Sequence, residues 1–384
     1  MHALANNEIL TSAEAAADEI AQHADWAEDS GRLHDDVVSL LKRIGVSRLY
    51  LPTKLGGLAV SPAQCAAVCE TLAESDSAAA WFVMVFNAAR LMAASWPEAT
   101  VEHLWADDPD LLLAASGHTP LTAVASGSGY VLNGQNSFVS GAHHAEYMMG
   151  PAVVPGRDGE MFMAIAPMAS CEIVPNWDTL GMRGTGSNDV RVNEVHVPAE
   201  FVINMSESRG PNSYYQDDLY RCPARVVFAT YVPIVLKMAE MALAELSALA
   251  QLKVPYATDK KLAHKYLAQQ HYGQGLALWR SAHTYFFTAL EQVYEQAQRG
   301  HKFDTQDRAD LYLAGTHALQ ASAQAVKHVM DAAGSSSLRK GSKLERIHRD
   351  TETLRHHGFA NESRYASVTQ AKWGVDLDYP LLLR

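Results

Sequence analysis

The spacing of apolar residues changes twice along the chain, and this double change restricts the fold more than any other feature. Apolar residues recur at helical spacing up to about residue 110. From Leu111 onward, apolar and polar residues alternate in short segments separated by glycine turns, and we expect hairpin turns at Gly127-Ser128-Gly129 and Asn133-Gly134. After Pro198, long stretches rich in Ala, Leu and Met return to helical spacing. We therefore expect an α+β chain with an N-terminal helical domain at residues 1–110, a β-barrel or sandwich at residues 111–208, and an antiparallel helical bundle at residues 209–384.

Composition restricts the partners of the 384-residue chain. Its formal net charge is −12, which argues against nucleic acid or an anionic membrane as the main partner, because both require basic surfaces. The apolar run from Ala78 to Trp96 contains Asn87 and Arg90, so we interpret it as a buried helix rather than a membrane span. The first ten residues lack a basic segment followed by an apolar one, so we expect a cytoplasmic protein.

The stretch from Leu180 to Pro198 reads LGMRGTGSNDVRVNEVHVP and holds the clearest candidate binding loop. A glycine-rich turn leads here into an alternating strand, apart from one slip at Asn193-Glu194 that is consistent with a bulge. A loop that leads into a strand has no helix N-terminus with which to hold phosphate, so the Rossmann and P-loop interpretations both fail. Any ligand must be bound by backbone amides, hydroxyl groups and Arg183. The alternative is an ordinary hairpin.

No metal site is expected. The four cysteines are scattered, and Cys65 and Cys69 fall at helical spacing in an alanine-rich segment, which is typical of buried thiols. Glu345 and His348 have the Glu-x-x-His spacing of di-iron bundle proteins, but residues 226–332 hold no second copy of that motif.

The order of the domains, together with the stretch Leu180–Pro198, resembles the acyl-CoA dehydrogenase superfamily over essentially the whole chain. Three patterns are similar to its branch of two-component (group D) flavin-dependent monooxygenases. These patterns are GYVLNG at residues 129–134 followed by SFVSG at residues 137–141, RGTGSND at residues 183–189, and Arg349-Asp350 followed by His357. The resemblance implies an acyl-CoA dehydrogenase-like fold that ends in a four-helix bundle.

The resemblance also implies an activity. We expect the oxygenase component of a monooxygenase that binds reduced FAD or FMN and reacts with O2 through a C4a-hydroperoxyflavin. One oxygen atom would then pass to a small aromatic or heteroaromatic substrate, such as a phenol or an indole. The chain has no nicotinamide-binding pattern, so a separate NAD(P)H:flavin reductase would supply the flavin. The superfamily also implies a homotetramer.

Site residues follow from the same resemblance. Ser140 is similar to the residue that hydrogen-bonds the flavin N5 region, and His357 is the candidate acid–base or hydrogen-bonding group on the substrate side. The other expected cofactor residues are Gly141, Arg183, Gly184, Thr185, Ser187, Arg349 and Asp350. The expected substrate-pocket residues are Trp81, Asn87, His118, His143 and His356, and further aromatic residues that could line the pocket are Phe82, Phe86, Tyr130 and Trp177.

Each of these residues has a structural alternative. A serine beside a glycine often bonds its own backbone, a histidine often caps a helix end, and aromatic residues are usually core. Arg349 and Asp350 would in that case form an ion pair that holds the last helix.

Two alternative functions stay open. An acyl-CoA dehydrogenase needs a base, and the position of the glutamate that many of them use falls at Gly358. Other relatives place the base on an earlier helix, where Glu240 and Glu245 stand. The second alternative is a scaffold of the same fold that binds no flavin.

Overall fold

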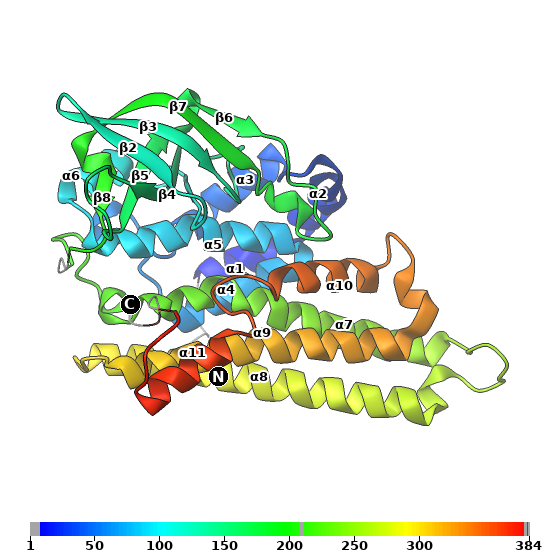
Figure 1. The fold of residues 1–384 in the computed structure, drawn as a ribbon. Coiled ribbons are helices and arrows are strands. Elements are labelled where there is room, and N and C mark those ends of the chain that lie inside the picture. Colours follow the sequence, from blue (N-terminus) through cyan, green and yellow to red (C-terminus); the bar gives the residue numbers. More distant parts are fainter. Residues whose placement is uncertain (1–7, 208–210, 380–381, 383–384) are drawn as a thin grey trace.

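The computed structural model describes residues 8–207, 211–379 and 382, and it has three layers (Figure 1). A curled β-sheet forms the top layer in this view, the N-terminal helices lie below it, and the long C-terminal helices form the bottom layer. The expected boundary between the second and third domains, at residues 208 and 209, lies outside the described residues.

The described N-terminal helices are α1 (Glu8–Ala15), α2 (Ala17–Ser30), α3 (Asp35–Arg43), α4 (Pro62–Ser75), α5 (Ser77–Met92) and α6 (Glu98–Trp105). Three of them, α3, α4 and α5, begin directly after a residue whose side chain caps the helix. Helix α4 has a full capping box between Ser61 and Gln64, with Pro62 at its first position. The Asp76 side chain caps α5, and all but a few residues of α5 are buried, which places this helix at the centre of the molecule.

The middle region forms one continuous curled sheet, which is the form that the expected barrel or sandwich takes. The strands are β1 (Leu113–Ala115), β2 (Leu121–Ser126), β3 (Gly129–Asn136), β4 (Tyr147–Val153), β5 (Phe162–Pro167), β6 (Cys171–Val174), β7 (Asp189–Pro198) and β8 (Val202–Asn204). Their order is β6-β7-β3-β2-β4-β5-β8, and β1 pairs with β4. Strand β4 is parallel to β1 and β2, and the other pairs are antiparallel.

A β-bulge interrupts the pairing of β3 with β7, as the slip at Asn193-Glu194 suggested. Leu132 pairs with Val195 but Gly134 pairs with Val192, so the register shifts between them. Glu194 has a φ of 52°, and its backbone N–H donates to Asn133 Oδ1 at 2.9 Å. The hairpin turn expected at Asn133-Gly134 is therefore wrong, because these residues lie inside β3. Asn133 and Gly134 lie opposite the bulge in β7, and the dipeptide sequence alone does not reveal this pairing.

The C-terminal region is helical and includes the expected bundle. Its helices are α7 (Val232–Leu252), α8 (Tyr266–Gln298), α9 (Thr305–Ala333), α10 (Lys343–Leu354) and α11 (Arg364–Trp373). Helices α8 and α9 lie side by side, α7 packs against α9, and α10 packs against both α7 and α9 (Figure 1).

Two helical segments are long and apolar enough to cross a membrane, Ser77–Ser95 and Ala224–Leu252. Of their most apolar windows, 78% and 83% is buried inside the protein, so both are core helices of this fold.

Candidate active site

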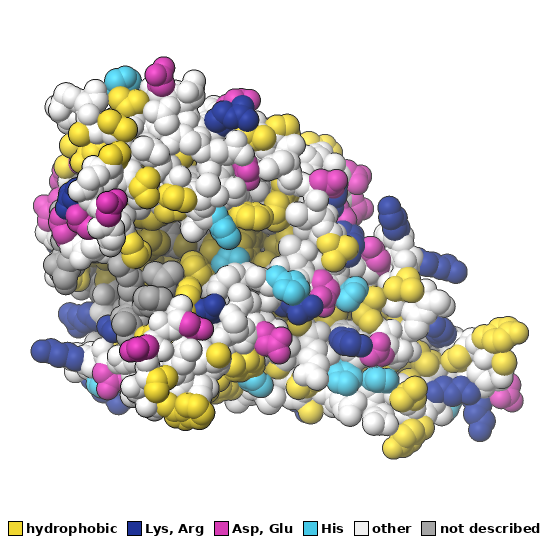
Figure 2. Space-filling model, in the orientation of Figure 1, with side chains coloured by type: hydrophobic (Ala, Val, Ile, Leu, Met, Phe, Trp, Pro, Cys, Tyr) yellow, Lys and Arg dark blue, Asp and Glu magenta, His cyan; other side chains and the backbone are white. Residues whose placement is uncertain are grey.

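The candidate site lies where four segments of the chain meet: α5, the turn between β3 and β4, the loop between β6 and β7, and the segment after α10. Figure 2 shows a hollow between the sheet layer and the C-terminal helices, with hydrophobic side chains on its floor and histidine side chains at its edge. Trp81 of α5 lies at the centre of the contacts described below.

A chain of buried hydroxyl groups starts at Trp81. Its indole Nε1 donates to Ser140 Oγ at 3.2 Å, and Ser140 Oγ lies 2.6 Å from Ser187 Oγ. Ser187 Oγ lies 2.8 Å from Thr185 Oγ1, which donates to the Met182 carbonyl oxygen at 2.8 Å. The four side chains from Trp81 to Thr185 belong to residues that are only 5–8% exposed. The structure thus brings together Ser140, Thr185 and Ser187, three of the predicted cofactor residues.

Two predicted cofactor residues, Gly141 and Gly184, are glycines because of packing. Gly141 has a φ of 75°, and a Cβ atom there would lie 2.8 Å from the ring of Phe86. A Cβ atom on Gly184 would lie 3.0 Å from that of Ala78 and 3.1 Å from that of Ala27. Both loops therefore approach the helices so closely that a Cβ atom would require neighbouring atoms to move. A direct contact of either glycine with a cofactor stays a prediction.

The side chain of Asp350 anchors the loop that carries Thr185 and Ser187. Its Oδ1 accepts from the Met182 backbone N–H at 2.6 Å, and its Oδ2 accepts from Ser77 Oγ at 2.5 Å. Burial raises the pKa of this carboxyl group, while the two hydrogen bonds oppose that shift. Asp350 therefore holds the loop against α5 and α10.

Arg349 does not form the ion pair with Asp350 that a structural interpretation of this dipeptide suggested. Its guanidinium contacts Glu28 and Glu345, each at 2.6 Å, and donates to the Leu180 carbonyl oxygen at 3.0 Å. Adjacent residues on a helix point in different directions, which explains the correction. Arg349 ties α10 to α2 and to the start of the same loop, and its predicted contact with the cofactor stays a prediction.

Arg183 is bound to the protein itself. Its Nη1 contacts Asp178 at 2.9 Å and donates to the Thr179 carbonyl oxygen at 3.2 Å, and its Nε donates to the Glu28 carbonyl oxygen at 3.3 Å. The Asp178 side chain is 92% exposed, so this ion pair is a weak one. Binding of a phosphate by Arg183 stays a prediction.

The imidazole of His357 also packs against Trp81. Its ring centroid is 5.4 Å from that of Trp81 and 5.1 Å from that of Tyr231. Within the described part of the chain, His357 Nδ1 is buried without a hydrogen-bond partner. Burial lowers the pKa of His357 to about 4, with a smaller contribution from His118. The imidazole is therefore neutral at neutral pH and has an unused polar atom.

Sequence reasoning missed two residues at this site. Tyr231 is fully buried, and its hydroxyl has no hydrogen-bond partner among the described residues. Phe138 is half exposed, has a φ of 61°, and lies between the rings of His118 at 4.8 Å and Trp177 at 6.1 Å. Phe138 belongs to the SFVSG motif, so the motif could have identified it, whereas no local pattern marks Tyr231.

Other predicted pocket residues have different surroundings. Asn87 is a correction: it is fully buried, accepts from the Tyr50 N–H, and donates to two backbone carbonyl oxygens, so all its polar groups serve the helical layer. His143 Nε2 lies 3.0 Å from the side-chain amide nitrogen of Asn188, at the end of the loop between β6 and β7. His356 is exposed, and among the described residues no ring contact joins it to Trp81 or Tyr231.

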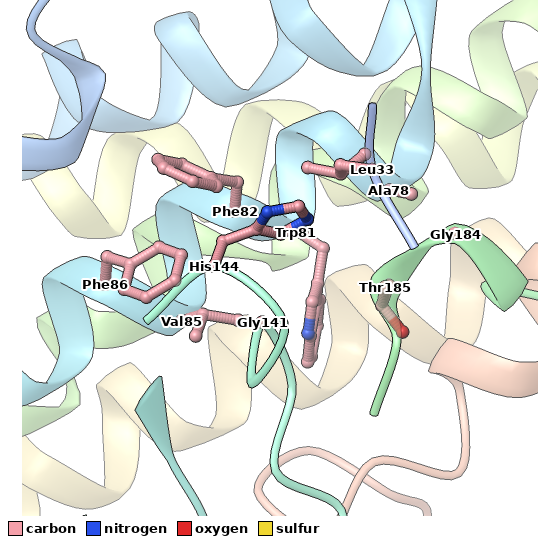
Figure 3. A pocket seen from close by; sticks show the side chains of 10 residues that line it. All are labelled: Leu33, Ala78, Trp81, Phe82, Val85, Phe86, Gly141, His144, Gly184 and Thr185. Carbon is pink, nitrogen blue, oxygen red and sulfur yellow. The ribbon is translucent and has the colours of Figure 1, made fainter. Parts of the chain in front are cut away.

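A small, mainly apolar cavity lies against the indole of Trp81. Figure 3 shows this indole between the turn at Gly141 and the loop at Thr185. The cavity is lined by Leu33, Ala78, Trp81, Phe82, Val85, Phe86, Gly141, His144, Gly184 and Thr185. The predicted aromatic residues Phe82 and Phe86 thus line the same cavity as Trp81 and Thr185.

Buried histidines make the fold sensitive to acid. Burial lowers the pKa of His144 to about 4, from an ordinary value of 6.5. Between these values the unfolded chain binds a proton that the folded chain does not, so stability falls as the pH drops from about 6.5 towards 4. We expect His144→Gln to reduce this loss by about 2 kcal/mol at pH 5 and to change little at pH 7.5. Urea unfolding at both pH values measures the difference, and equal effects at the two would contradict the shift.

Comparison with known proteins places the chain among flavoenzyme sequences. The model of the acyl-CoA dehydrogenase N-terminal domain matches residues 8–96, and that of the acyl-CoA dehydrogenase C-terminal domain matches residues 229–362.

Individual relatives cover nearly the whole chain. An indole-3-acetate monooxygenase of Acinetobacter baumannii is 26% identical over 91% of this chain and 89% of its own. The oxygenase component of p-hydroxyphenylacetate 3-hydroxylase from the same organism is 26% identical over 91% and 85%. The structure of XiaF from Streptomyces sp. in complex with FADH2 and glycerol matches with a TM-score of 0.91 at 21% identity, over 97% of this chain and 96% of that one.

Proposed function

Because the chain belongs to the acyl-CoA dehydrogenase superfamily, we propose that it is the oxygenase component of a two-component flavin-dependent monooxygenase. The observation that carries the proposal is that Trp81 contacts both Ser140 and the imidazole of His357, whose Nδ1 has no hydrogen-bond partner among the described residues. Relatives named as monooxygenases of an indole and of a phenol support an aromatic substrate.

The residues present fit a bound flavin. The flavin ring edge carries hydrogen-bonding groups, and the hydroxyl chain ends at Ser140 with lone pairs on its Oγ. The turn at Gly141 packs closely against Phe86 next to Ser140, and the mainly apolar cavity beside Trp81 limits water. Reduced FAD or FMN, when bound, supplies the electrons that activate O2 for transfer to a substrate. XiaF contains FADH2, but this does not decide between FAD and FMN here.

His357 would act on the substrate. Its neutral imidazole can accept a hydrogen bond, or a proton, from a phenol or an indole N–H as the ring is oxygenated. The aromatic rings of Trp81, Tyr231 and Phe359 around it favour a flat substrate. His118 and Phe138 would form the outer wall.

The dehydrogenase alternative lacks its usual glutamate base, because position 358 is a glycine. Gly358 has no side chain, and nothing lies within 4 Å of the position that a Cβ atom would take there. Glu240 pairs with Lys237 at 2.7 Å and its side chain is 44% exposed, while Glu245 pairs with Lys343 at 3.3 Å and is 39% exposed. Neither glutamate is a desolvated base of the kind that proton abstraction from an acyl group requires.

The proposal also includes a partner reductase and an oligomeric state. The chain would receive reduced flavin from a separate NAD(P)H:flavin reductase. In support, the similar p-hydroxyphenylacetate 3-hydroxylase protein is named as an oxygenase component. We also propose a cytoplasmic homotetramer. Sedimentation equilibrium tests the tetramer, and a monomer at micromolar concentration would contradict it.

The decisive experiment is anaerobic titration with reduced FMN and reduced FAD, followed by mixing with O2 and a panel of phenols and indoles. The proposal requires saturable binding of reduced flavin and incorporation of one atom of 18O2 into a product. A scaffold would bind no flavin, and a dehydrogenase would instead retain oxidised flavin that an acyl-CoA bleaches.

Ser140→Ala is expected to raise the share of electrons lost as hydrogen peroxide about tenfold, because one hydrogen bond near the reacting flavin is worth about 1 kcal/mol or more. Peroxide and product are measured in the same reaction with excess substrate. Ser206→Ala is the matched control, because Ser206 caps the Met161 N–H far from Trp81. Unchanged coupling in Ser140→Ala would remove Ser140 from the mechanism.

A further inference from the structure

The hydroxyl chain beside Trp81 has two ends whose hydrogen-bonding roles cannot change. At one end, the indole N–H of Trp81 can only donate, and it contacts Ser140 Oγ. At the other end, the Met182 carbonyl oxygen can only accept, and it contacts Thr185 Oγ1. Between these ends each hydroxyl has one hydrogen to give.

The number of hydrogens equals the number of bonds. One indole hydrogen and three hydroxyl hydrogens serve four contacts: Trp81 to Ser140, Ser140 to Ser187, Ser187 to Thr185, and Thr185 to Met182. Thr185 gives its hydrogen to Met182, so Ser187 must give its own to Thr185. Ser140 must then donate to Ser187. Only this direction satisfies every contact, and it leaves Ser140 with a lone pair but no hydrogen for a ligand.

Further contacts hold the accepting end in place. The Met182 carbonyl oxygen also accepts from Trp177 Nε1 at 3.0 Å, and the Met182 N–H is bound by Asp350. Met182 has a φ of 55°, an uncommon conformation for a residue with a side chain, so the loop fixes this peptide by several bonds. The direction of the chain is therefore built into the fold.

We propose that Thr185 and Ser187 are positioning residues that make Ser140 a pure hydrogen-bond acceptor, so that the site selects reduced over oxidised flavin. The inference rests on the proposed function and on Ser140 facing the flavin N5. Reduced flavin carries a hydrogen on N5 and can donate it to Ser140 Oγ. Oxidised flavin has a lone pair on N5, which would face the lone pair of Ser140 without a hydrogen between them.

This arrangement suits an oxygenase that exchanges flavin with a reductase. Reduced flavin is retained while O2 reacts, and the spent oxidised flavin loses one hydrogen bond and leaves. The proposal gives Thr185 and Ser187 an indirect role, because the hydrogen of each hydroxyl is already used within the protein. Their direct contacts with the cofactor stay a prediction.

Ser187→Ala tests the proposal, because it frees the Ser140 hydrogen to be donated to N5. We expect the Kd for oxidised flavin to fall about fivefold to tenfold, since one net hydrogen bond is gained, while reduced flavin binds no tighter. Thr185→Val should act in the same direction, because Ser187 can then donate to Ser140. Thr179→Val is the control: its hydroxyl bonds the Gly181 carbonyl oxygen outside the chain, and it should leave the ratio of the two Kd values unchanged.

Anaerobic titration gives Kd for the reduced flavin and aerobic fluorescence quenching gives it for the oxidised flavin. Damage to the loop would weaken binding of oxidised and reduced flavin by the same factor, so the ratio of the two Kd values would stay unchanged. That result would overturn the proposal. The wild-type protein provides a test that needs no variant: equal affinity for the two forms also overturns it. If the wild type binds and uses reduced flavin but the variants leave the ratio of the two Kd values unchanged, only the positioning role is refuted. If the wild type binds no flavin, the proposed function is refuted as well.

Discussion

Replacing His357 with alanine is expected to slow substrate oxygenation about 100-fold, the lower end of what a positioned acid–base group contributes. The imidazole lies 5.4 Å from the Trp81 ring, centroid to centroid, and its Nδ1 has no partner among the described residues, so it is free to bind substrate. The reaction of bound reduced flavin with O2 should keep its rate, because the substitution removes no member of the hydroxyl chain. Single-turnover mixing with and without substrate separates the two steps.

His356→Ala is the matched control for this experiment. His356 is the adjacent residue, but it is exposed and has no ring contact with Trp81 or Tyr231 within the described part of the chain. Its rates should equal those of the wild type. If His357→Ala and His356→Ala oxygenate substrate equally fast, His357 has only a structural role at the end of α10.

Asp350→Ala is expected to lower the free energy of unfolding by about 3 kcal/mol, because it leaves the buried Met182 N–H and Ser77 hydroxyl without their partner. The same change should weaken binding of reduced flavin, since Met182 terminates the hydroxyl chain. Urea unfolding and anaerobic titration measure the two effects.

Asp350→Asn and Asp25→Ala are the two control variants for this prediction. Asparagine can still accept from the Met182 N–H and donate to Ser77, so it should retain most of the stability and flavin affinity. The Asp25 side chain is 98% exposed and pairs with Arg346 at the surface, so its removal should cost less than about 1 kcal/mol. A loss in Asp350→Ala no larger than that in Asp25→Ala would show that the loop does not depend on the carboxylate.

The pattern of the sequence predicted elements well wherever local chemistry defines them. The capping signals at Ser61 and Pro62 mark the start of α4, and the alternation of valines in β7 survives its bulge. Strand β8 has three residues, all of them buried, so it shows no alternation of buried and exposed positions that would mark it as a strand. The turn expected at Asn133-Gly134 failed for a different reason: the same dipeptide suits a hairpin and a bulged strand, and only the partner strand decides.

Residue roles were harder to predict than elements. Asn87, a polar residue in an apolar helix, was predicted to face the substrate pocket, yet backbone groups of Val46 and Tyr50 take its hydrogen bonds. Arg349 and Asp350 are neighbours in sequence but act on different partners, one through Glu28 and the other through Met182. Such assignments depend on contacts between residues that are far apart in the sequence, for example 37 positions for Asn87 and Tyr50 and 168 positions for Asp350 and Met182, and a single sequence does not encode them locally.

By itself, the sequence determined the order of helical, β and helical regions, the glycine loop that precludes a dinucleotide-binding helix, and the motifs that carry the family resemblance. These features follow from periodicity and turn chemistry, which act over a few residues. Only the tertiary structure decided that Ser140, Ser187, Thr185 and Met182 form one chain of hydrogen bonds with a single direction. The direction arises because the fold places a group that only donates at one end and a group that only accepts at the other.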